Sequence, residues 1–375
     1  MSSPWAVLFG GPSPEHEISI LTGLQAERVL TDSGESVVPI YWAPSGEWFQ
    51  VPAHTEAKDY LDGVPKGSKP IDVRLSGEPG LYIKKKALDL SAVLFTLHGG
   101  VGEGGGAAAL FSLLGIPATG SSLFAGAVGM DKLAFGGLML ASGIPSLTRE
   151  LLSFTTEPSF AGPYIVKPRF GGSSIGIEIV DDLEAARAIG KGSAQLRAGA
   201  VLEPYRPDLV DLNISFRTFP SLDTTDVEKP LRGDSGSGLY SYAEKYLSGG
   251  SAGAGFMSAP REFPAVLADG LAEKADQLAR RVAEVTGITG VARVDLLLDE
   301  KTGDLFVNEV NSIPGALSLY LWAPKVAAAT VLKDALVEAR DKRFVLPASG
   351  FGSGAALRAA GGIAGKLVGL NGPRG

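Results

Sequence analysis

Alternating apolar and polar residues stand out in two neighbouring runs within Val291–Ser318, on either side of a polar segment. This pattern predicts a β-hairpin. Side chains alternate between the two faces of a strand, so Arg293 and Asp295 should share one face of the first strand. Glu309 and Asn311 should likewise share one face of the second strand. If the hairpin closes, a guanidinium, two carboxylates and an amide converge on one spot.

Two interpretations of this spot are open. Oxygen ligands of this kind suit a hard cation, and Mg²⁺ typically binds one or two carboxylates together with substrate phosphates. The alternative is a solvated hairpin face whose charges fall at these positions by chance. Charged residues within otherwise apolar strands, followed by the turn at Pro314-Gly315, favour the cation site because buried charges need partners.

The first third of the chain has the pattern of an α/β domain. Short apolar runs predict buried strands at 5–9, 37–42 and 92–97. A helix should follow the first strand, capped by Ser13 and with Pro14 in its first position. Further helices are predicted around 106–114 and 123–142. The polar, Pro/Gly-rich residues 54–80 should form a surface connection.

The remaining pattern predicts two more units. Strand, loop, strand and helix within 164–205 indicate a small α+β domain, and a strand at 212–219 should join the hairpin in a later sheet. Between that strand and the hairpin lies 233–256, a long segment rich in Gly and Ser, which is typical of a lid. Helices are predicted at 265–287 and 333–342.

Composition narrows the function. The chain has 375 residues, enough for two or three domains, and its net charge of −7 argues against general nucleic-acid binding, which rests on neutralising phosphates. It has no cysteine, which excludes disulfides, thiolate catalysis and Cys-based metal sites. We find no signal peptide and no apolar run of membrane-spanning length, so we expect a soluble cytoplasmic protein with no membrane partner.

A Gly/Ser-rich loop follows the strand that ends near Lys167, and the sequence from Lys167 to Gly176 is KPRFGGSSIG. Glycines let backbone N–H groups approach a phosphate, the two serines add hydroxyl donors, and Lys167 adds positive charge. The loop joins two predicted strands, so it is neither a Walker loop nor a dinucleotide-binding fingerprint. From the spacing alone, a phosphate loop and an ordinary glycine hairpin turn remain equally open.

Carboxylates and a histidine mark further strand ends. Glu203 could recognise an adenine edge together with backbone donors, and Asp211 could hold ribose hydroxyls, although exposed acidic residues are the simpler interpretation. Glu15 stands at the start of the first helix, where a favourable interaction with the helix dipole would also explain it. His98 ends a buried strand beside glycines, where functional loops gather, but a lone histidine is more often structural.

Taken in order, these residues resemble the D-alanine–D-alanine ligases of the ATP-grasp superfamily, over about residues 4–343. The matching motifs are GGPSPEHEIS, HGGVGE, MDK, VKPRFGGSSIG, YAEKYLS, ARVDLLL and FVNEVNSIPG. The resemblance implies an α/β fold of three domains, with ATP between the central and C-terminal ones. We therefore expect an N-terminal Rossmann-like (pre-ATP-grasp), substrate-binding domain at 1–121, a central ATP-grasp subdomain at 122–204, a catalytic C-terminal subdomain at 205–345 with the lid 233–256, and a Gly/Ala-rich tail at 346–375.

The resemblance also implies roles for individual residues. ATP would be contacted by Lys132, Lys167, Ser174, Glu203, Tyr205, Asp211 and, from the lid, Lys245. Mg²⁺, or Mn²⁺ in its place, would be held by Asp295, Glu309 and Asn311. In the catalytic set, Glu15 would bind the ammonium of the first amino acid, and Ser173 and Tyr246 would link Glu15 with the lid and the substrate by hydrogen bonds. Arg293 and the Gly315 N–H would stabilise the oxyanion.

The chain departs from the family pattern at several positions, and Gly104 and Ala108 stand where the family usually has Asp and Gln. Gly136 stands where the family usually has a second lysine, shortly after the Asp131-Lys132 pair. After Gly315 the chain is shorter than the family's segment, which binds the carboxylate of the second amino acid. The resemblance implies that Ser318 would have this role here.

The implied reaction is amide formation through an acyl phosphate. The leading hypothesis is a D-alanine–D-alanine ligase of peptidoglycan synthesis that acts on ATP and amino acids, with a homodimer as one possible assembly. The alternatives are an ATP-grasp amino-acid ligase with a different acceptor in specialised metabolism, and a nucleotide-binding protein that has lost catalysis. The intact Asp295, Glu309 and Asn311 argue against the last. Tyr246 stands where D-alanine-specific members carry tyrosine, which favours an amine acceptor over a hydroxy acid.

Overall fold

The structure, a computed structural model, describes residues 3–155, 157–231, 260–342, 354–360, 363 and 367. The chain divides into two compact units, Met1–Arg343 and Phe344–Gly375, and the described part of the second contains the short helix α11 (Ala355–Ala359). The predicted lid 233–256 lies outside the described residues. None of the described helices is both long enough and apolar enough to cross a membrane. The predicted domain boundaries stay a prediction.

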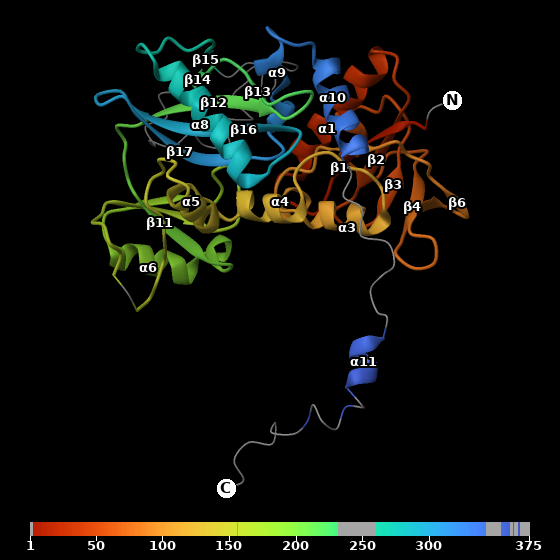
Figure 1. Cartoon of the computed structure of the whole chain (residues 1–375), viewed down its shortest axis with the longest axis horizontal. Coiled ribbons are helices and arrows are strands. Elements are labelled where there is room, and N and C mark those ends of the chain that lie inside the picture. Colours follow the sequence, from red (N-terminus) through yellow and green to blue (C-terminus); the bar gives the residue numbers. More distant parts are fainter. Residues whose placement is uncertain are drawn as a thin grey trace. The chain divides into compact units, whose positions relative to one another are not determined.

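A seven-stranded sheet in the order β6-β5-β4-β3-β2-β1-β7 forms the N-terminal part of the first unit (Figure 1). Its strands are β1 (Trp5–Gly10), β2 (Val37–Trp42), β3 (Trp48–Gln50), β4 (Lys69–Arg74), β5 (Gly80–Ile83), β6 (Lys86–Ala87) and β7 (Val93–Phe95). β1 pairs in parallel with β2 and β7, and the other neighbours are antiparallel. The helical elements of this part are α1 (His16–Asp32), η1 (Ala57–Tyr60), α2 (Gly100–Glu103) and α3 (Gly106–Leu114). The predicted strands near 5–9, 37–42 and 92–97 are confirmed.

Two predictions for this region are wrong. Residues 54–80 contain β4, which the sequence pattern did not reveal because Ile71 is its only buried residue and the alternation is too weak to read. Helix α1 begins at His16 and not at Pro14. The hydroxyl of Ser13 accepts the backbone N–H of Glu15 at 3.1 Å, so it shapes the loop before the helix and does not cap the helix itself.

Residues from far along the chain complete the core of this first sheet. The buried apolar cluster that contains β1, β2 and β7 also includes Trp322 from α9 (Leu319–Trp322), and Val331, Leu332 and Leu336 from α10 (Ala328–Asp341). Helix α10 contacts both α1 and β7, and Figure 1 shows it beside α1. Each fully buried side chain of this size contributes roughly 1.5–3 kcal/mol relative to exposure. The C-terminal helices are therefore part of what stabilises the N-terminal sheet.

The central sheet has four strands in the order β10-β9-β11-β8. They are β8 (Glu150–Leu151), β9 (Tyr164–Pro168), β10 (Glu178–Val180) and β11 (Ala200–Pro204). With α6 (Leu183–Gly192) and η2 (Ala194–Leu196) they enclose a small apolar core that includes Val166 and Leu202. Asp182 caps α6 by accepting the backbone N–H of Ala185 at 2.8 Å. The predicted succession of strand, loop, strand and helix is confirmed.

The third sheet, β13-β12-β16-β17, contains the predicted hairpin. Its strands are β12 (Val210–Arg217), β13 (Asp223–Thr224), β16 (Val291–Asp299) and β17 (Asp304–Asn311). Helix α8 (Leu271–Thr286) lies across β12 and β16 (Figure 1). It buries an apolar stripe that includes Leu278 and Val282. Helices α4 (Leu123–Met130) and α5 (Lys132–Ala141) contact β17. A separate ribbon pairs β14 (Lys229–Pro230) with β15 (Arg261–Glu262).

The helix predicted at 123–142 is two helices, α4 and α5, and the break at Asp131 matters for the site. The backbone of Asp131 is extended, and its carboxylate accepts the N–H groups of Leu133 at 3.1 Å and Ala134 at 3.2 Å. Asp131 therefore caps α5 and lets that helix start in a new direction. As a result, Lys132 in the first turn of α5 reaches the loop that follows β9.

Candidate active site

A cavity of about 220 Å³ lies where residues from the three sheets meet. The predicted site residues on its wall are Glu15, Lys132, Lys167, Ser173, Ser174, Glu203, Tyr205, Asp211, Arg293, Asp295, Glu309, Asn311 and Gly315. Lys245 and Tyr246 lie outside the described residues, and Ser318 does not line the cavity. The fold thus gathers most of the predicted residues around one space, although they come from both ends of the chain.

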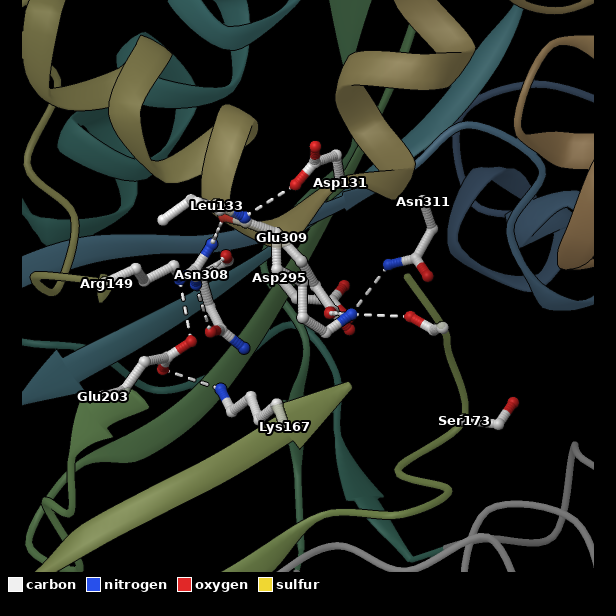
Figure 2. Close-up of polar contacts among 12 residues, drawn as sticks. Asp131, Leu133, Arg149, Lys167, Ser173, Glu203, Asp295, Asn308, Glu309 and Asn311 are labelled. Carbon is white, nitrogen blue, oxygen red and sulfur yellow. Dashed lines mark hydrogen bonds and ion pairs between the residues drawn. The ribbon is translucent and has the colours of Figure 1, made fainter. Parts of the chain in front are cut away.

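The hairpin presents one basic and three oxygen-bearing side chains to this cavity. In the antiparallel pairing of β16 and β17, Arg293 lies opposite Asn311 and Asp295 lies opposite Glu309, as the alternation predicts. Arg293 binds Asp295 through two nitrogens, Nε to Oδ1 at 2.6 Å and Nη2 to Oδ2 at 2.8 Å. Asn311 Nδ2 also donates to Asp295 Oδ2, at 3.1 Å (Figure 2). Burial opposes the charge of Arg293, but Asp295 outweighs it and raises the pKa of the guanidinium well above its usual value.

The oxygen atoms of the hairpin have the chemistry of a magnesium site. Among the described residues, no three His, Cys, Asp or Glu side chains form a metal site by themselves. Asp295, Glu309 and Asn311 instead supply two carboxylates and an amide, and Mg²⁺ at nucleotide sites takes its other ligands from water and phosphates. Lys132 Nζ lies 3.5 Å from Glu309 Oε2, so a cation already balances one of the carboxylates. The donor set fits the ion, and its role as a ligand set stays a prediction.

Glu203 is the centre of a second, buried charge cluster. Lys167 Nζ donates to its Oε2 at 2.7 Å, and Arg149 Nε donates to its Oε1 at 2.8 Å (Figure 2). Burial alone would raise the pKa of Glu203, but Arg149 and Lys167 outweigh burial and hold that pKa below its usual value. Burial lowers the pKa of Lys167, and Glu203 opposes this shift. The cluster holds two basic groups against one acid, which favours a bound anion nearby.

Sequence reasoning did not identify Arg149, which ties three elements together without lining the cavity. A bulge in β17 leaves Asn308 without a partner on β16. Arg149 Nη2 donates to the backbone oxygen of Asn308 and, at 3.0 Å, to its Oδ1, while Nη1 donates to Lys132 O at 3.4 Å (Figure 2). With its bond to Glu203, Arg149 therefore links α5, β11 and β17. No local signal marks it, because it is a single arginine outside every motif.

The Gly/Ser-rich loop joins β9 to the antiparallel β10, as predicted. Ser173 and Ser174 adopt left-handed backbone angles, with φ of 52° and 59°. Lys132 Nζ donates to Gly171 O at 2.6 Å, and Ser173 Oγ donates to Glu15 Oε1 from the first sheet. The loop is thus held from two other elements. The contact between Ser173 and Glu15 is present, while phosphate binding by the loop and ammonium binding by Glu15 stay predictions.

Two titratable residues, the buried His98 and the partly buried Glu103, also line the cavity. Glu103 accepts two backbone N–H bonds, at 2.9 and 3.1 Å. Burial, reinforced by the nearby Glu15, raises the pKa of Glu103 to about 7. His98 Nε2 lies 2.9 Å from Thr22 Oγ1, and burial lowers the pKa of His98 to about 4. A histidine that stays neutral and is paired within the fold agrees with the structural interpretation left open by the sequence.

The segment after Pro314 departs from the role implied for Ser318. Its element η4 (Gly315–Ser318) contains three consecutive left-handed residues, Ala316, Leu317 and Ser318, with φ of 49°, 48° and 52°. A left-handed helical conformation costs roughly 1–2 kcal/mol per residue. Ser318 is fully buried, and its hydroxyl has no hydrogen-bond partner among the described residues. The structure therefore places Ser318 away from the cavity wall, contrary to the expectation that it contacts a substrate.

A polar cluster that sequence reasoning missed occupies the cavity wall beside this segment. The nearly buried carboxylate of Glu228 accepts hydrogen bonds from Tyr320 Oη at 3.1 Å and Asn213 Nδ2 at 2.9 Å. Arg261 Nη1 donates to Glu228 at 3.4 Å, and the Arg261 guanidinium lies 4.6 Å from the centre of the Tyr320 ring. All four side chains line the cavity. They come from separate elements and share no sequence pattern, so only the fold reveals them.

Two family models match the chain. The model described as "D-ala D-ala ligase N-terminus" matches residues 5–121, and the one described as "D-ala D-ala ligase C-terminus" matches residues 128–339. A curated relative, the D-alanine–D-alanine ligase of Mycolicibacterium vanbaalenii, is 31% identical over 346 residues, which cover 85% of this chain and 91% of that protein. The D-alanine–D-alanine ligase of Thermosipho melanesiensis is 28% identical over 352 residues, 90% of this chain and 93% of that protein.

Solved structures share the fold. The VanG D-Ala:D-Ser ligase from Enterococcus faecalis matches with a TM-score of 0.74 and 22% identity, over 91% of this chain and 100% of that one. The D-alanyl-alanine synthetase A from Vibrio cholerae matches with a TM-score of 0.75 and 21% identity, over 91% of this chain and 99% of that one. At these identities the likeness concerns the fold alone. The predicted α/β ATP-grasp fold is confirmed.

Proposed function

This chain belongs to the D-alanine–D-alanine ligase family, and we propose that it joins two D-alanine molecules in an ATP-dependent reaction. The observation that carries the proposal is the hairpin wall of the cavity, where a guanidinium fixed by two bonds to Asp295 lies beside the pair of Glu309 and Lys132. Fixed charges of both signs around one cavity suit phosphoryl transfer followed by attack at a carbonyl carbon. The comparisons give no support to the alternative of a different acceptor in specialised metabolism.

The first step would be phosphoryl transfer. A carboxylate oxygen of the first D-alanine attacks the γ-phosphorus of ATP, the bond to the β–γ bridging oxygen breaks, and ADP leaves an acyl phosphate behind. Lys132 and Lys167 would neutralise phosphate charge, because this chemistry depends mainly on positioning and electrostatics. When bound at the hairpin carboxylates, Mg²⁺, or Mn²⁺ in its place, would supply further positive charge to the phosphates.

The nucleotide would lie against the central sheet. Both oxygens of Glu203 already accept bonds from Arg149 and Lys167, so we propose that Glu203 acts mainly by fixing Lys167. Tyr205 and Asp211 line the same cavity and would contact the adenine and the ribose. Ser174, in the loop after β9, would add a hydroxyl donor near the phosphates.

The second step would form the amide. Glu15, which accepts a bond from Ser173, would hold the ammonium of the first D-alanine. The amine of the second D-alanine attacks the acyl carbon, the bond to the phosphate oxygen breaks, and the nitrogen releases a proton. Arg293 and the Gly315 N–H would stabilise the negative charge that develops on the acyl oxygen.

Product analysis tests the proposal. The chain is supplied with ATP, Mg²⁺ and D-alanine, D-serine, D-lactate or L-alanine in turn, and phosphate release and mass spectra are recorded, with reactions lacking ATP as controls. D-alanyl-D-alanine as the dominant product supports the proposal. An ester from D-lactate, or ready ligation of another amine without a dipeptide from D-alanine, would contradict the substrates. Absence of phosphate release with every substrate would contradict the ligase itself.

Three further expectations stay predictions. The homodimer and the cytoplasmic location rest on the sequence alone. The roles of Lys245 and Tyr246 fall outside the described residues. The product analysis bears on Tyr246 indirectly, because its preference for an amine acceptor would appear as rejection of D-lactate.

A further inference from the structure

The second amino acid carries a carboxylate that needs a binding group, and Ser318 is too deeply buried to supply one. The cavity wall beside the same segment presents Arg261 and Tyr320 instead. We propose that Arg261, held in place by Tyr320, binds the α-carboxylate of the acceptor amino acid in this chain. The proposal rests on the proposed function, since it names the groups that would hold the second substrate of that reaction.

The shortened segment explains why Tyr320, and not Ser318, lines the cavity beside Arg261. The left-handed run from Ala316 to Ser318 turns the chain within three residues, with φ near 50° at each. Ser318 ends up fully buried, whereas Gly315 before the run and Tyr320 after it both line the cavity. Strained backbone of this kind persists only where the surroundings hold it in place. The consequence of the turn is an aromatic ring on the cavity wall, and Arg261 stacks against it.

The chemistry of Arg261 suits a carboxylate. A guanidinium presents its N–H groups in a planar fork that matches the two oxygens of a carboxylate. The guanidinium of Arg261 stacks 4.6 Å from the centre of the Tyr320 ring, which fixes its plane on the cavity wall. Tyr320 Oη donates its single hydrogen to Glu228 at 3.1 Å, which holds the Tyr320 ring where it stacks against Arg261.

Glu228 has a supporting role. It accepts bonds from Tyr320 and Asn213 as well as from Arg261, so its negative charge is shared among three donors. This arrangement orients Arg261 and Tyr320 together, and we regard Glu228 as a positioning residue. The charges that face the site are balanced in pairs, Arg261 with Glu228 and Arg293 with Asp295. An incoming acceptor therefore meets two guanidinium groups whose partner carboxylates are both already hydrogen-bonded.

A competition between two acceptors tests the proposal. D-alanine and D-alaninamide are supplied together with ATP and Mg²⁺, and the ratio of D-alanyl-D-alanine to D-alanyl-D-alaninamide is measured by mass spectrometry. D-alaninamide has no carboxylate, so it can serve only as acceptor. Both products need the same phosphorylation of the first D-alanine, so a defect at the ATP site lowers both and leaves their ratio unchanged. Arg261→Met should lower the ratio by about 10- to 100-fold, the value of a charge-assisted hydrogen bond. Arg261→Lys should restore part of the preference.

Two matched variants make the test specific. Lys229→Met removes the same charge from β14, the strand paired with β15, at a residue that binds Glu300 and does not line the cavity. It should keep the wild-type ratio. Tyr320→Phe should lower the ratio less than Arg261→Met does. Ser318→Ala should leave the ratio unchanged, since its hydroxyl is buried away from the cavity.

The outcomes separate the two proposals. A wild-type chain that forms no D-alanyl-D-alanine contradicts the proposed function. If the chain forms this dipeptide, and the ratio of the two products falls in Ser318→Ala but not in folded Arg261→Met, the proposed acceptor site is wrong. Ser318 would then bind the acceptor carboxylate, as the family pattern implies. If Arg261→Met fails to fold, Arg261→Lys decides. An unchanged ratio in that variant, together with an unchanged ratio in Tyr320→Phe, would also overturn the proposal.

Discussion

Adding a single methyl group at Gly136 tests whether Arg149 is held as firmly as its contacts indicate. A Cβ at Gly136 would lie 2.8 Å from Cδ of Arg149 and 3.5 Å from its Cγ. Carbon atoms normally approach only to about 3.5–4.0 Å. The stem of Arg149 would have to move, although its guanidinium is bound to Glu203, to Asn308 and to the backbone of Lys132. Gly136→Ala should therefore loosen the link among α5, β11 and β17.

The neighbouring glycine provides the control. Gly137 lies in the same helix, α5, and a Cβ there would meet nothing within 4 Å. Alanine at either position gains about 1 kcal/mol of helix propensity over glycine. At Gly136 this gain is offset by overpacking, which costs typically about 1–3 kcal/mol, and by strain on charged hydrogen bonds of about 1.5–3 kcal/mol each. We expect Gly137→Ala to stabilise the protein by about 1 kcal/mol and Gly136→Ala to destabilise it by about 1–2 kcal/mol.

Urea unfolding and steady-state kinetics together check this expectation. Compared with the wild type, the urea midpoint of unfolding should be higher in Gly137→Ala and lower in Gly136→Ala. Gly136→Ala should also raise KM for ATP, because Arg149 fixes Glu203, whose other oxygen binds Lys167. Gly137→Ala should leave KM for ATP unchanged. If the two alanines stabilise the protein equally and neither changes KM for ATP, the reasoning that Arg149 is a fixed link is refuted.

Two further predictions concern acids on the cavity wall. Glu309→Gln should lower the ligation rate by at least about 100-fold while the far-ultraviolet circular dichroism stays native, since even outer-shell changes at metal sites cost up to this much. Glu300→Gln in the hairpin turn is the control. Near-normal turnover of folded Glu309→Gln at saturating Mg²⁺ would show that Glu309 does not bind the metal. Glu103→Gln should flatten the pH dependence of stability, because burial and Glu15 raise the folded pKa of Glu103 from 4.5 to about 7. A raised acid pKa gives stability that is full below pH 4.5 and is lost as the pH rises through about 7. The free energy of unfolding of the wild type should thus fall by up to about 3 kcal/mol more than that of Glu103→Gln across this window. Urea unfolding that shows the same pH dependence for both proteins would contradict a protonated Glu103 carboxyl in the folded state.

Local pattern was enough to predict the hairpin and which of its side chains converge. Alternation along β16 and β17 fixes which side chains share a face, so the convergence of Arg293, Asp295, Glu309 and Asn311 followed from strand geometry alone. Strand β4 escaped prediction because its single buried residue, Ile71, gives no alternation. A strand of this kind is defined by its neighbours in the sheet and not by its own sequence.

The parts of the site that could not be predicted depend on contacts between distant elements. Arg149 meets Asn308 only because a bulge in β17 leaves that residue unpaired. Arg261 of β15 and Tyr320 of α9 meet at Glu228, the residue before β14, only after these elements have packed around one cavity. Family resemblance identified the position of Ser318 but could not show that a shortened segment turns it inward. Sequence motifs therefore located the predicted reacting groups, and only the tertiary structure shows what surrounds them.

The way α10 completes the first sheet has a consequence for synthesis of the chain. The core of this sheet joins Phe111 and Leu114 to Val331 and Leu336, so more than 200 residues separate its early and late parts. At a ribosomal rate of about 5–20 residues per second, roughly 10–40 s pass between them. During this interval the nascent N-terminal sheet has an apolar surface that α10 has not yet covered. Chaperone binding to ribosome-bound chains should accordingly persist until α10 emerges. A nonsense mutation just before Ala328 should give a product that is degraded, even though every predicted reacting group is intact.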